Sequence, residues 1–306
     1  MPPWGGALGE AYTSGVLGNV LTAIVTPFRA DGAVDFEAFQ ALATHLVDNG
    51  SDGLVVAGTT GESPTLTDAE RLDLFRAAIE AVGGRATVVA GTGTYSTDHS
   101  VHLTSEAAAI GVDGALVVTP YYNKPPQRGI VAHFEAVARA SELPIVVYNI
   151  PSRVVVNIEP ETISRLAEIE TVRAVKQANP DLAQARHIVD TGLTLYAGDD
   201  NVLQAFLELG AAGGICVHTH LVGPQVAEQV RAVQAGDFDR ARAIDAELTA
   251  AYELLQIQTN PIPVKAALAM LGHDVGGHRL PLVSASDEER VQVQECLTRL
   301  GLLVAA

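Results

Sequence analysis

The segment Gly53-Leu54-Val55-Val56-Ala57 is a continuous apolar run, and Gly58-Thr59-Thr60-Gly61-Glu62 follows it directly. A helical pattern begins shortly afterwards, at 67–81, where Thr67 and Glu70 have the spacing of a capping box. A short apolar strand followed by a helix is typical of a parallel sheet that is covered on both faces. We therefore interpret this stretch as one β/α unit with polar residues at the carboxyl end of its strand.

The same unit recurs along the whole chain. Eight apolar runs are found, at 20–25, 53–57, 87–90, 115–119, 145–148, 172–176, 193–197 and 214–217. Helical patterns lie between them, at 36–48, 67–81, 99–109, 129–140, 160–169, 182–190 and 202–209. Eight units fit a closed barrel better than an open sheet. The predicted fold is therefore α/β, a (β/α)8 TIM barrel with additional C-terminal helices, and a doubly wound sheet is the alternative.

The chain is expected to have three parts. Residues 1–18 form a flexible N-terminal tail, 19–224 form the barrel, and 225–306 form a C-terminal helical appendage. Within the appendage, helical patterns occur at 225–235, 238–256, 263–270 and 288–300. The 306 residues, 48% of them hydrophobic, suffice for one barrel-sized core.

Charge and cysteine content restrict the class of protein. The formal net charge of −17 argues against nucleic acid and anionic membranes as partners, because they carry charge of the same sign. The two cysteines, Cys216 and Cys296, are typical of buried thiols in a reducing compartment. No leader pattern and no apolar stretch of membrane-spanning length is found in the sequence. We therefore expect a cytoplasmic protein.

One lysine lies where barrel enzymes place their chemistry, at the carboxyl end of a strand. The chain has three lysines: Lys176 ends the apolar run 172–176, Lys124 lies in a polar loop, and Lys265 lies in the first turn of a helix. Imine formation requires a lysine amine that is partly neutral, and burial favours the neutral form. Lys176 is therefore either a catalytic amine or a buried lysine paired with a carboxylate. We expect Lys265 at the surface or an interface.

Other strand ends carry hydroxyls and histidines. Thr59 and Thr60 lie in a turn whose N–H groups can hold a carboxylate, or serve only the turn itself. Tyr148 ends the fifth run and is either catalytic or a core tyrosine. His218 and His220 follow the eighth run, and they either share a face as zinc ligands or are hydrogen-bonded histidines.

Six motifs occur in order along the chain and together resemble one family. They are 58–63 (Gly-Thr-Thr-Gly-Glu-Ser), 119–123 (Thr-Pro-Tyr-Tyr-Asn), 148–153 (Tyr-Asn-Ile-Pro-Ser-Arg), 175–176 (Val-Lys), 198–200 (Gly-Asp-Asp) and 260–265 (Asn-Pro-Ile-Pro-Val-Lys). This pattern resembles the dihydrodipicolinate synthase and N-acetylneuraminate lyase superfamily from about Val20 to Leu303. The Pro151-Ser152-Arg153 segment is similar to the synthase branch. Three features depart from the usual pattern: Val154, Gln177 and the stretch His218-Thr219-His220.

The resemblance implies a Schiff-base lyase that condenses pyruvate with L-aspartate 4-semialdehyde to 4-hydroxy-tetrahydrodipicolinate, in lysine and diaminopimelate biosynthesis. It implies that the imine forms on Lys176 and that Tyr148, Thr59 and Tyr122 relay protons, with Tyr122 reaching in from a neighbouring subunit. The substrate-binding positions that it implies are Thr60, Arg153 and Ile215. It also implies a homo-oligomer, a dimer of dimers, that needs no cofactor and no metal.

Two alternatives remain open at this point. One is another pyruvate-dependent class I aldolase or dehydratase of the same superfamily, acting on a 2-keto-3-deoxy sugar acid. The other is a metal-dependent aldolase that uses His218 and His220.

The resemblance also bears on feedback inhibition by lysine. The positions that match the lysine-binding cleft of sensitive members are Ser63, Asp68, Arg71, Tyr95, His99 and Tyr121. His99 stands where a glutamate is usual and Arg71 where a histidine is usual, so a negative charge is lost and a positive charge is gained. We expect weak inhibition by lysine or none.

Overall fold

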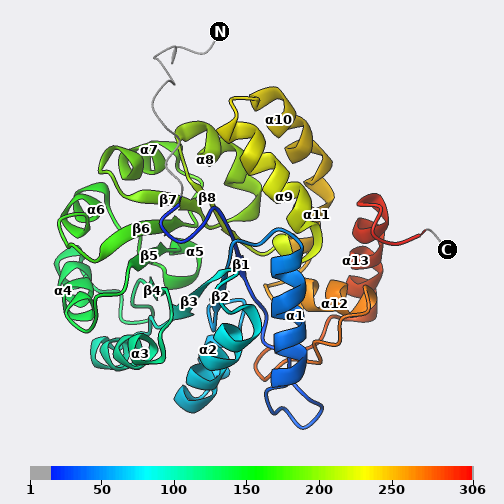
Figure 1. Ribbon diagram of the computed structural model, residues 1–306, viewed down its shortest axis with the longest axis horizontal. Coiled ribbons are helices and arrows are strands. Elements are labelled where there is room, and N and C mark those ends of the chain that lie inside the picture. Colours follow the sequence, from blue (N-terminus) through cyan, green and yellow to red (C-terminus); the bar gives the residue numbers. More distant parts are fainter. Residues whose placement is uncertain (1–14, 305–306) are drawn as a thin grey trace.

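The strands form a closed parallel barrel (Figure 1). The computed structural model describes residues 15–304. The strands pair in sequence order, and β8 pairs with β1 to close the barrel. This confirms the predicted (β/α)8 barrel and rules out the doubly wound sheet, because an open sheet would leave two unpaired edges. The strands are β1 (Val20–Ala23), β2 (Gly53–Val56), β3 (Thr87–Gly91), β4 (Gly114–Val118), β5 (Ile145–Asn149), β6 (Val172–Gln177), β7 (Thr194–Ala197) and β8 (Gly213–Cys216).

A ring of helices surrounds the barrel (Figure 1). These helices are α1 (Phe36–Asp48), α2 (Asp68–Val82), α3 (Thr97–Ile110), α4 (Gln127–Ala138), α6 (Pro160–Leu166), α7 (Leu182–Asp190), α8 (Leu203–Leu209) and α9 (Thr219–Gln234). The predicted capping box is present at the start of α2, where Thr67 and Glu70 satisfy each other's backbone N–H groups. Each strand therefore enters a helix on the outside of the barrel, as the alternating pattern predicts.

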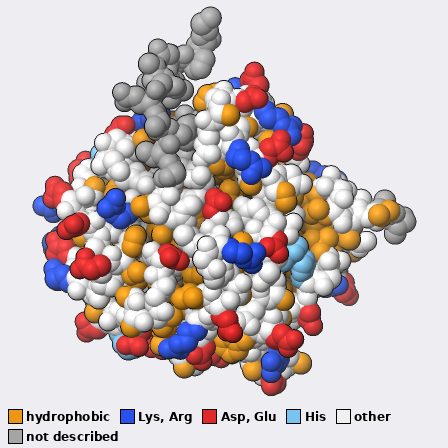
Figure 2. Space-filling model, in the orientation of Figure 1, with side chains coloured by type: hydrophobic (Ala, Val, Ile, Leu, Met, Phe, Trp, Pro, Cys, Tyr) orange, Lys and Arg blue, Asp and Glu red, His pale blue; other side chains and the backbone are white. Residues whose placement is uncertain are grey.

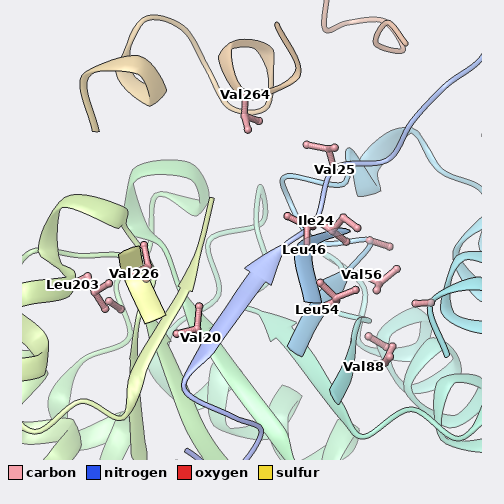
Figure 3. Packing of buried hydrophobic residues seen from close by; sticks show 14 of the residues in the cluster. Val20, Ile24, Val25, Leu46, Leu54, Val56, Val88, Leu203, Val226 and Val264 are labelled. Carbon is pink, nitrogen blue, oxygen red and sulfur yellow. The ribbon is translucent and has the colours of Figure 1, made fainter. Parts of the chain in front are cut away.

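The strands are buried on both faces because alternate side chains point into and out of the barrel. Leu21, Val55 and Val89 belong to an inner cluster, whereas their neighbours in sequence belong to an outer cluster between strands and helices. Figure 3 shows residues of the outer cluster, among them Val20 of β1 and Val226 of α9. This two-sided burial explains why the runs in the sequence are continuously apolar.

The helix α9 completes the ring, although the predicted appendage began inside it, at residue 225. It packs against β1 and lies between α8 and α1. Its backbone is kinked at Val222, two residues before Pro224, and the helical pattern recognised in the sequence begins only after this proline. The helices beyond the ring are α10 (Phe238–Glu247), α11 (Thr249–Gln256), α12 (Ile262–Met270) and α13 (Asp287–Arg299), which gather on one side of the barrel (Figure 1).

The predicted tail, residues 1–18, lies mainly outside the described residues, which begin at Gly15. Leu17 is only 3% exposed. Its backbone N–H donates to the Tyr196 hydroxyl, with 3.2 Å between N and Oη, and its carbonyl accepts from the Thr87 hydroxyl at 2.6 Å. Residues 15–18 are therefore packed at the amino end of the barrel.

The distribution of charged side chains (Figure 2) and the burial of the cysteines are those of a globular protein. Figure 2 shows acidic and basic side chains interspersed over one face. Cys216 and Cys296 are buried free cysteines. Among residues 15–304, no helix combines the length and the hydropathy that crossing a membrane requires.

Candidate active site

A cavity of about 310 Å³ lies at the carboxyl ends of the strands. It brings together five residues that the sequence singles out: Thr59, Thr60, Tyr148, Arg153 and Lys176. The remaining lining residues are Ile150, Gly198, Asp199, Asp200, Asn201, Val217, Tyr252, Leu255, Gln256 and Asn260.

Lys176 lies at the carboxyl end of β6, directly opposite Tyr148 of β5 in the parallel register. Its Nζ is 4.4 Å from the centroid of the Tyr148 ring, and the residue is 5% exposed. Within residues 15–304 no salt bridge pairs Lys176 with a carboxylate. The geometry therefore favours a reactive amine over a structural lysine held by an acid.

An acidic side chain near the lysine is kept less acidic than usual. Burial is the main cause that raises the pKa of Asp199, and the neighbouring Asp200 acts in the same direction. The positive charges of Lys176 and Arg153 partly oppose this shift. The cavity therefore contains the amine of Lys176, the guanidinium of Arg153 and, at Asp199, a carboxyl group whose proton is bound more readily than in water.

The turn after β2 presents two threonines to the cavity. Within the turn, the N–H of Glu62 donates to the carbonyl of Thr59 over 3.1 Å. Asn260 Nδ2 donates to Thr60 Oγ1 over 2.8 Å, so the Thr60 hydroxyl is an acceptor there and its own proton remains free to donate. A side chain at Gly61 would place Cβ 3.1 Å from Ala57 Cα, a tight contact that favours the absence of a side chain there. The turn can therefore offer hydroxyl and N–H donors to a carboxylate.

Arg153 lies at the mouth of the cavity on a short helix that the sequence pattern does not reveal. This helix, α5 (Pro151–Val154), follows β5 immediately and begins at a proline, whose fixed φ suits the first helical position. The guanidinium is exposed, and its Nη2 lies 3.4 Å from Thr259 Oγ1. A planar, permanently charged group in this place suits a substrate carboxylate.

Two predicted site residues do not line the cavity. Tyr122 is 90% exposed and has a positive φ of 71°. Ile215 is fully buried in β8, where it pairs with Leu21 of β1. Neither residue is part of the cavity lining of its own chain, and Ile215 belongs to the inner cluster of the barrel.

Several lining residues come from the C-terminal helices, and sequence reasoning did not find them. Tyr252, Leu255 and Gln256 lie on α11, and Asn260 follows it. The hydroxyl of Tyr252 donates to Asp245 Oδ1 over 2.8 Å, and burial is the largest cause that raises its pKa. Only Asn260 has a signal in the sequence, because it opens the motif Asn260-Pro261.

Of the two interpretations of His218 and His220, zinc ligands or hydrogen-bonded histidines, the contacts of His220 support the second. The Nδ1 of His220 donates to the Val217 carbonyl over 2.8 Å, and its Nε2 accepts from the N–H of Val25 over 3.2 Å. Both nitrogens therefore serve the backbone, and burial lowers the pKa of His220 to about 4.

His218 instead pairs with Asp200. Its Nδ1 lies 2.5 Å from Asp200 Oδ1, which also accepts from the N–H groups of Val217 and His218 over 2.7 Å each. Asp200, Cys216 and His218 form the single group of possible metal ligands within residues 15–304, with atoms within 4.8 Å of one another. The Asp200 oxygen is already occupied by donors, so this group is best described as a hydrogen-bonded cluster.

Lys265, predicted at the surface or an interface, is in fact 2% exposed. Its Nζ donates to Glu62 Oε1 over 3.1 Å and to the Thr26 carbonyl over 2.9 Å. Burial lowers its pKa, and the charge of Glu62 opposes this effect. The prediction failed because the partner of Lys265 lies about 200 residues away in the sequence.

Comparison with known proteins agrees with this geometry. The model of the dihydrodipicolinate synthetase family matches residues 16–300. The 4-hydroxy-tetrahydrodipicolinate synthase of Synechococcus elongatus is 48% identical over 292 residues, covering 94% of this chain and 98% of the relative. The enzyme of the same name from Moorella thermoacetica is 50% identical over 289 residues, covering 94% and 99%.

Solved structures agree as well. The structure of the enzyme from Cyanidioschyzon merolae with lysine bound has a TM-score of 0.93 at 42% identity, covering 95% of this chain and all of that one. Dihydrodipicolinate synthase from Aquifex aeolicus has a TM-score of 0.90 at 43% identity, covering 93% and 98%. With the motifs, the barrel and the cavity in agreement, the chain belongs to the dihydrodipicolinate synthetase family.

Proposed function

We propose that this protein is a 4-hydroxy-tetrahydrodipicolinate synthase, a class I lyase that condenses pyruvate with L-aspartate 4-semialdehyde in lysine and diaminopimelate biosynthesis. The observation that carries the proposal is the buried amine of Lys176, which lies against Tyr148 with Thr59 and Thr60 in the same cavity. The relatives that share its length bear this name.

The first half of the reaction activates pyruvate on Lys176. The amine attacks the keto carbon, water leaves, and an imine forms between lysine and substrate. The hydroxyl of Thr60 and the N–H groups of its turn hold the pyruvate carboxylate. A methyl proton then leaves, its C–H electrons form a C=C bond, and the electrons of the C=N bond move onto the positively charged imine nitrogen, which gives a neutral enamine. Because the lysine itself is the electron sink, the step needs neither metal nor organic cofactor.

The second half joins the aldehyde and releases the lysine. The enamine carbon attacks the aldehyde carbon of the second substrate, whose oxygen takes up a proton and becomes a hydroxyl. The amine of the same substrate then attacks the imine carbon, expels Lys176 and closes the ring. The exposed guanidinium of Arg153 binds the carboxylate of this substrate at the mouth of the cavity.

Proton transfers accompany each of these steps. Tyr148 lies beside the lysine amine, and Thr59 lines the same cavity. Hydroxyl groups both donate and accept, so these residues suit a proton relay. Tyr122 is the third residue of the proposed relay and reaches the site from a neighbouring subunit. The almost complete exposure of its side chain on its own chain supports this assignment.

The assembly and location follow from the same proposal. We propose a homo-oligomer, a dimer of dimers, that works in the cytoplasm. In each chain the barrel extends through α9, and the helical appendage begins with α10.

Borohydride trapping tests the proposed function. Reduction in the presence of pyruvate should add one three-carbon adduct per chain, mapped by peptide mass to Lys176. Lys176→Ala should abolish the adduct, whereas Lys124→Ala, the matched change at an exposed-loop lysine, should retain it. Product analysis with aspartate semialdehyde, against a panel of 2-keto-3-deoxy acids, then identifies the reaction. An adduct at Lys124 or Lys265 would overturn the site, and turnover of a sugar acid alone would overturn the substrate.

A further inference from the structure

Residues of the C-terminal appendage hold the turn that carries Thr59 and Thr60 through Glu62, the last residue of the turn. Lys265 of α12 reaches the turn and donates from Nζ to Glu62 Oε1 over 3.1 Å. The side chains of Lys265 and Glu62 are 1% and 0% exposed. The same Nζ also donates to the carbonyls of Thr26 and Gly277, so all three of its protons have acceptors.

The backbone of a second residue of the appendage, Arg279, completes the contact with Glu62. The backbone N–H of Arg279 donates to Glu62 Oε2 over 3.2 Å, so both carboxylate oxygens are bound. Lys265 Nζ and Arg279 Cζ lie 4.7 and 4.6 Å from the centroid of the Phe28 ring. Figure 3 shows Val264 of α12 pointing toward the segment after β1 that carries Val25. The appendage and the barrel are thus packed together around the turn.

Three successive residues of the turn are each tied to a residue outside it. Thr60 Oγ1 accepts from Asn260 over 2.8 Å, and the Gly61 carbonyl accepts from Thr26 Oγ1 over 2.8 Å. Glu62 is held by Lys265 and has a positive φ of 55°, a conformation that a residue with a side chain adopts only at a cost in energy. The position of the two threonines therefore depends on contacts that lie outside the cavity.

A gain in stability does not by itself account for the buried ion pair between Lys265 and Glu62. Removing two charges from water is costly, and a buried ion pair often contributes no net stability compared with apolar side chains of the same size. Its geometric effect is more specific, because charge-assisted hydrogen bonds are short and directional. In this fold the pair lies directly behind the donors proposed for the pyruvate carboxylate.

We infer that Lys265 and Glu62 are positioning residues, which fix the turn Gly58–Glu62 so that its donors meet the substrate carboxylate. The appendage is then part of the substrate-binding apparatus. This inference rests on the proposed function for its effect on pyruvate, whereas its effect on the turn stands without it.

The test compares Glu62→Gln, Lys265→Met and the double variant E62Q/K265M with the wild-type protein. The double variant leaves no unpaired buried charge, so it remains informative if either single variant fails to fold. Ile244→Ala is the control, because Ile244 is a buried residue of α10, a helix that packs mainly against α9, and its truncation lowers stability generally.

Two measurements test the variants. Amide exchange reports the local stability of the turn, and pyruvate dependence reports how well the turn binds the substrate. Amide hydrogen exchange at Glu62 and Ser63, whose N–H groups donate within the turn, should be faster in all three variants and unchanged in the control. The pyruvate concentration needed for half-maximal trapping at Lys176, and the KM for pyruvate, should rise on the order of 10- to 100-fold. The kcat at saturating pyruvate should fall much less.

The outcomes separate this inference from the proposed function. Folded variants with wild-type exchange at the turn and wild-type pyruvate dependence would overturn the inference alone. Wild-type protein that forms no adduct with pyruvate would overturn the proposed function, and the exchange measurement would still decide whether the pair holds the turn. A general loss of protection that the Ile244→Ala control shares would mean that the pair is only structural.

Discussion

At the scale of single residues, the site depends on the register between β5 and β6. Tyr148 and Lys176 are partners across the two strands, which places the aromatic ring beside the amine. A shift of one residue would turn either side chain to the other face of the sheet. The strand pairing therefore determines the chemistry at this point, more than any local preference of the two residues.

Loss of the Tyr148 hydroxyl should slow the reaction without unfolding the protein. Tyr148→Phe keeps the ring that packs beside Lys176 and removes only the hydroxyl that we propose as a proton carrier. General acid–base groups typically contribute about 10²- to 10⁴-fold, so we expect kcat to fall by that order. Steady-state turnover measures this, with thermal unfolding as the control for folding. Turnover equal to wild type would remove Tyr148 from the relay.

The guanidinium of Arg153 should matter for the second substrate only. Arg153→Ala should raise the KM for aspartate semialdehyde and leave the pyruvate dependence of imine trapping unchanged, because the charge lies at the mouth of the cavity. Arg139→Ala, at an exposed arginine that ends α4, is the matched control. Equal damage to both substrates would mean that Arg153 supports the structure of α5.

At the scale of elements, helix ends are placed by local chemistry. Thr67 with Glu70 begins α2, and Asp35 begins α1 by accepting from the N–H of Ala38. Asp68 in the first turn of α2 also reaches α3, where its carboxylate lies 2.9 Å from His99 Nε2. The space between α2 and α3 therefore contains a carboxylate that already has a partner.

This pairing predicts weak inhibition by lysine or none. A bound lysine needs a free carboxylate for its ammonium groups, but Asp68 is engaged by His99. Nearby, Arg71 is 5% exposed and donates to the Ser63 carbonyl over 2.7 Å, which adds a permanent positive charge. The measurement is a lysine titration of turnover at near-saturating substrates. Strong partial inhibition at sub-millimolar lysine would contradict this interpretation of the cleft.

At the scale of the whole molecule, the adjacent residues Tyr121 and Tyr122 suggest that the chain forms an oligomer. Tyr121 packs edge-on against Tyr95, with ring centroids 5.6 Å apart, whereas Tyr122 beside it is 90% exposed. A large exposed aromatic in a conformation with positive φ is costly for an isolated chain. Contact with a second copy would offset that cost.

Mixing two inactive variants tests whether active sites are shared between chains. Lys176→Ala lacks the amine and Tyr122→Ala lacks the relay hydroxyl, so each homo-oligomer should be nearly inactive. After dissociation and reassociation of the mixture, hybrids should regain activity, because a Lys176→Ala chain supplies an intact Tyr122 to its neighbour. Sedimentation should show at least a dimer. A fully active monomer, or a mixture without recovery, would refute sharing.

Much of the fold was predictable because it follows from local patterns. Eight apolar runs alternating with helices require a parallel sheet, and their number favours closure. Lys176 and Tyr148 were identifiable because each stands at the end of such a run. The bounds of α1 and α7 agree with the sequence pattern to the residue, since caps are local.

Tertiary structure alone decided the rest, because the relevant contacts join distant parts of the chain. The apolar segment around Lys265 contains no sign of Glu62, and the pattern of α11 contains no sign that Tyr252 borders the cavity. The spacing of His218 and His220 is compatible with metal ligands and with hydrogen-bonded histidines, and only the contacts of His220 with the backbone of Val217 and Val25 distinguish the two. A sequence records periodicity and residue type, which specify local structure, whereas the partner of a buried charge is specified only when the chain closes on itself.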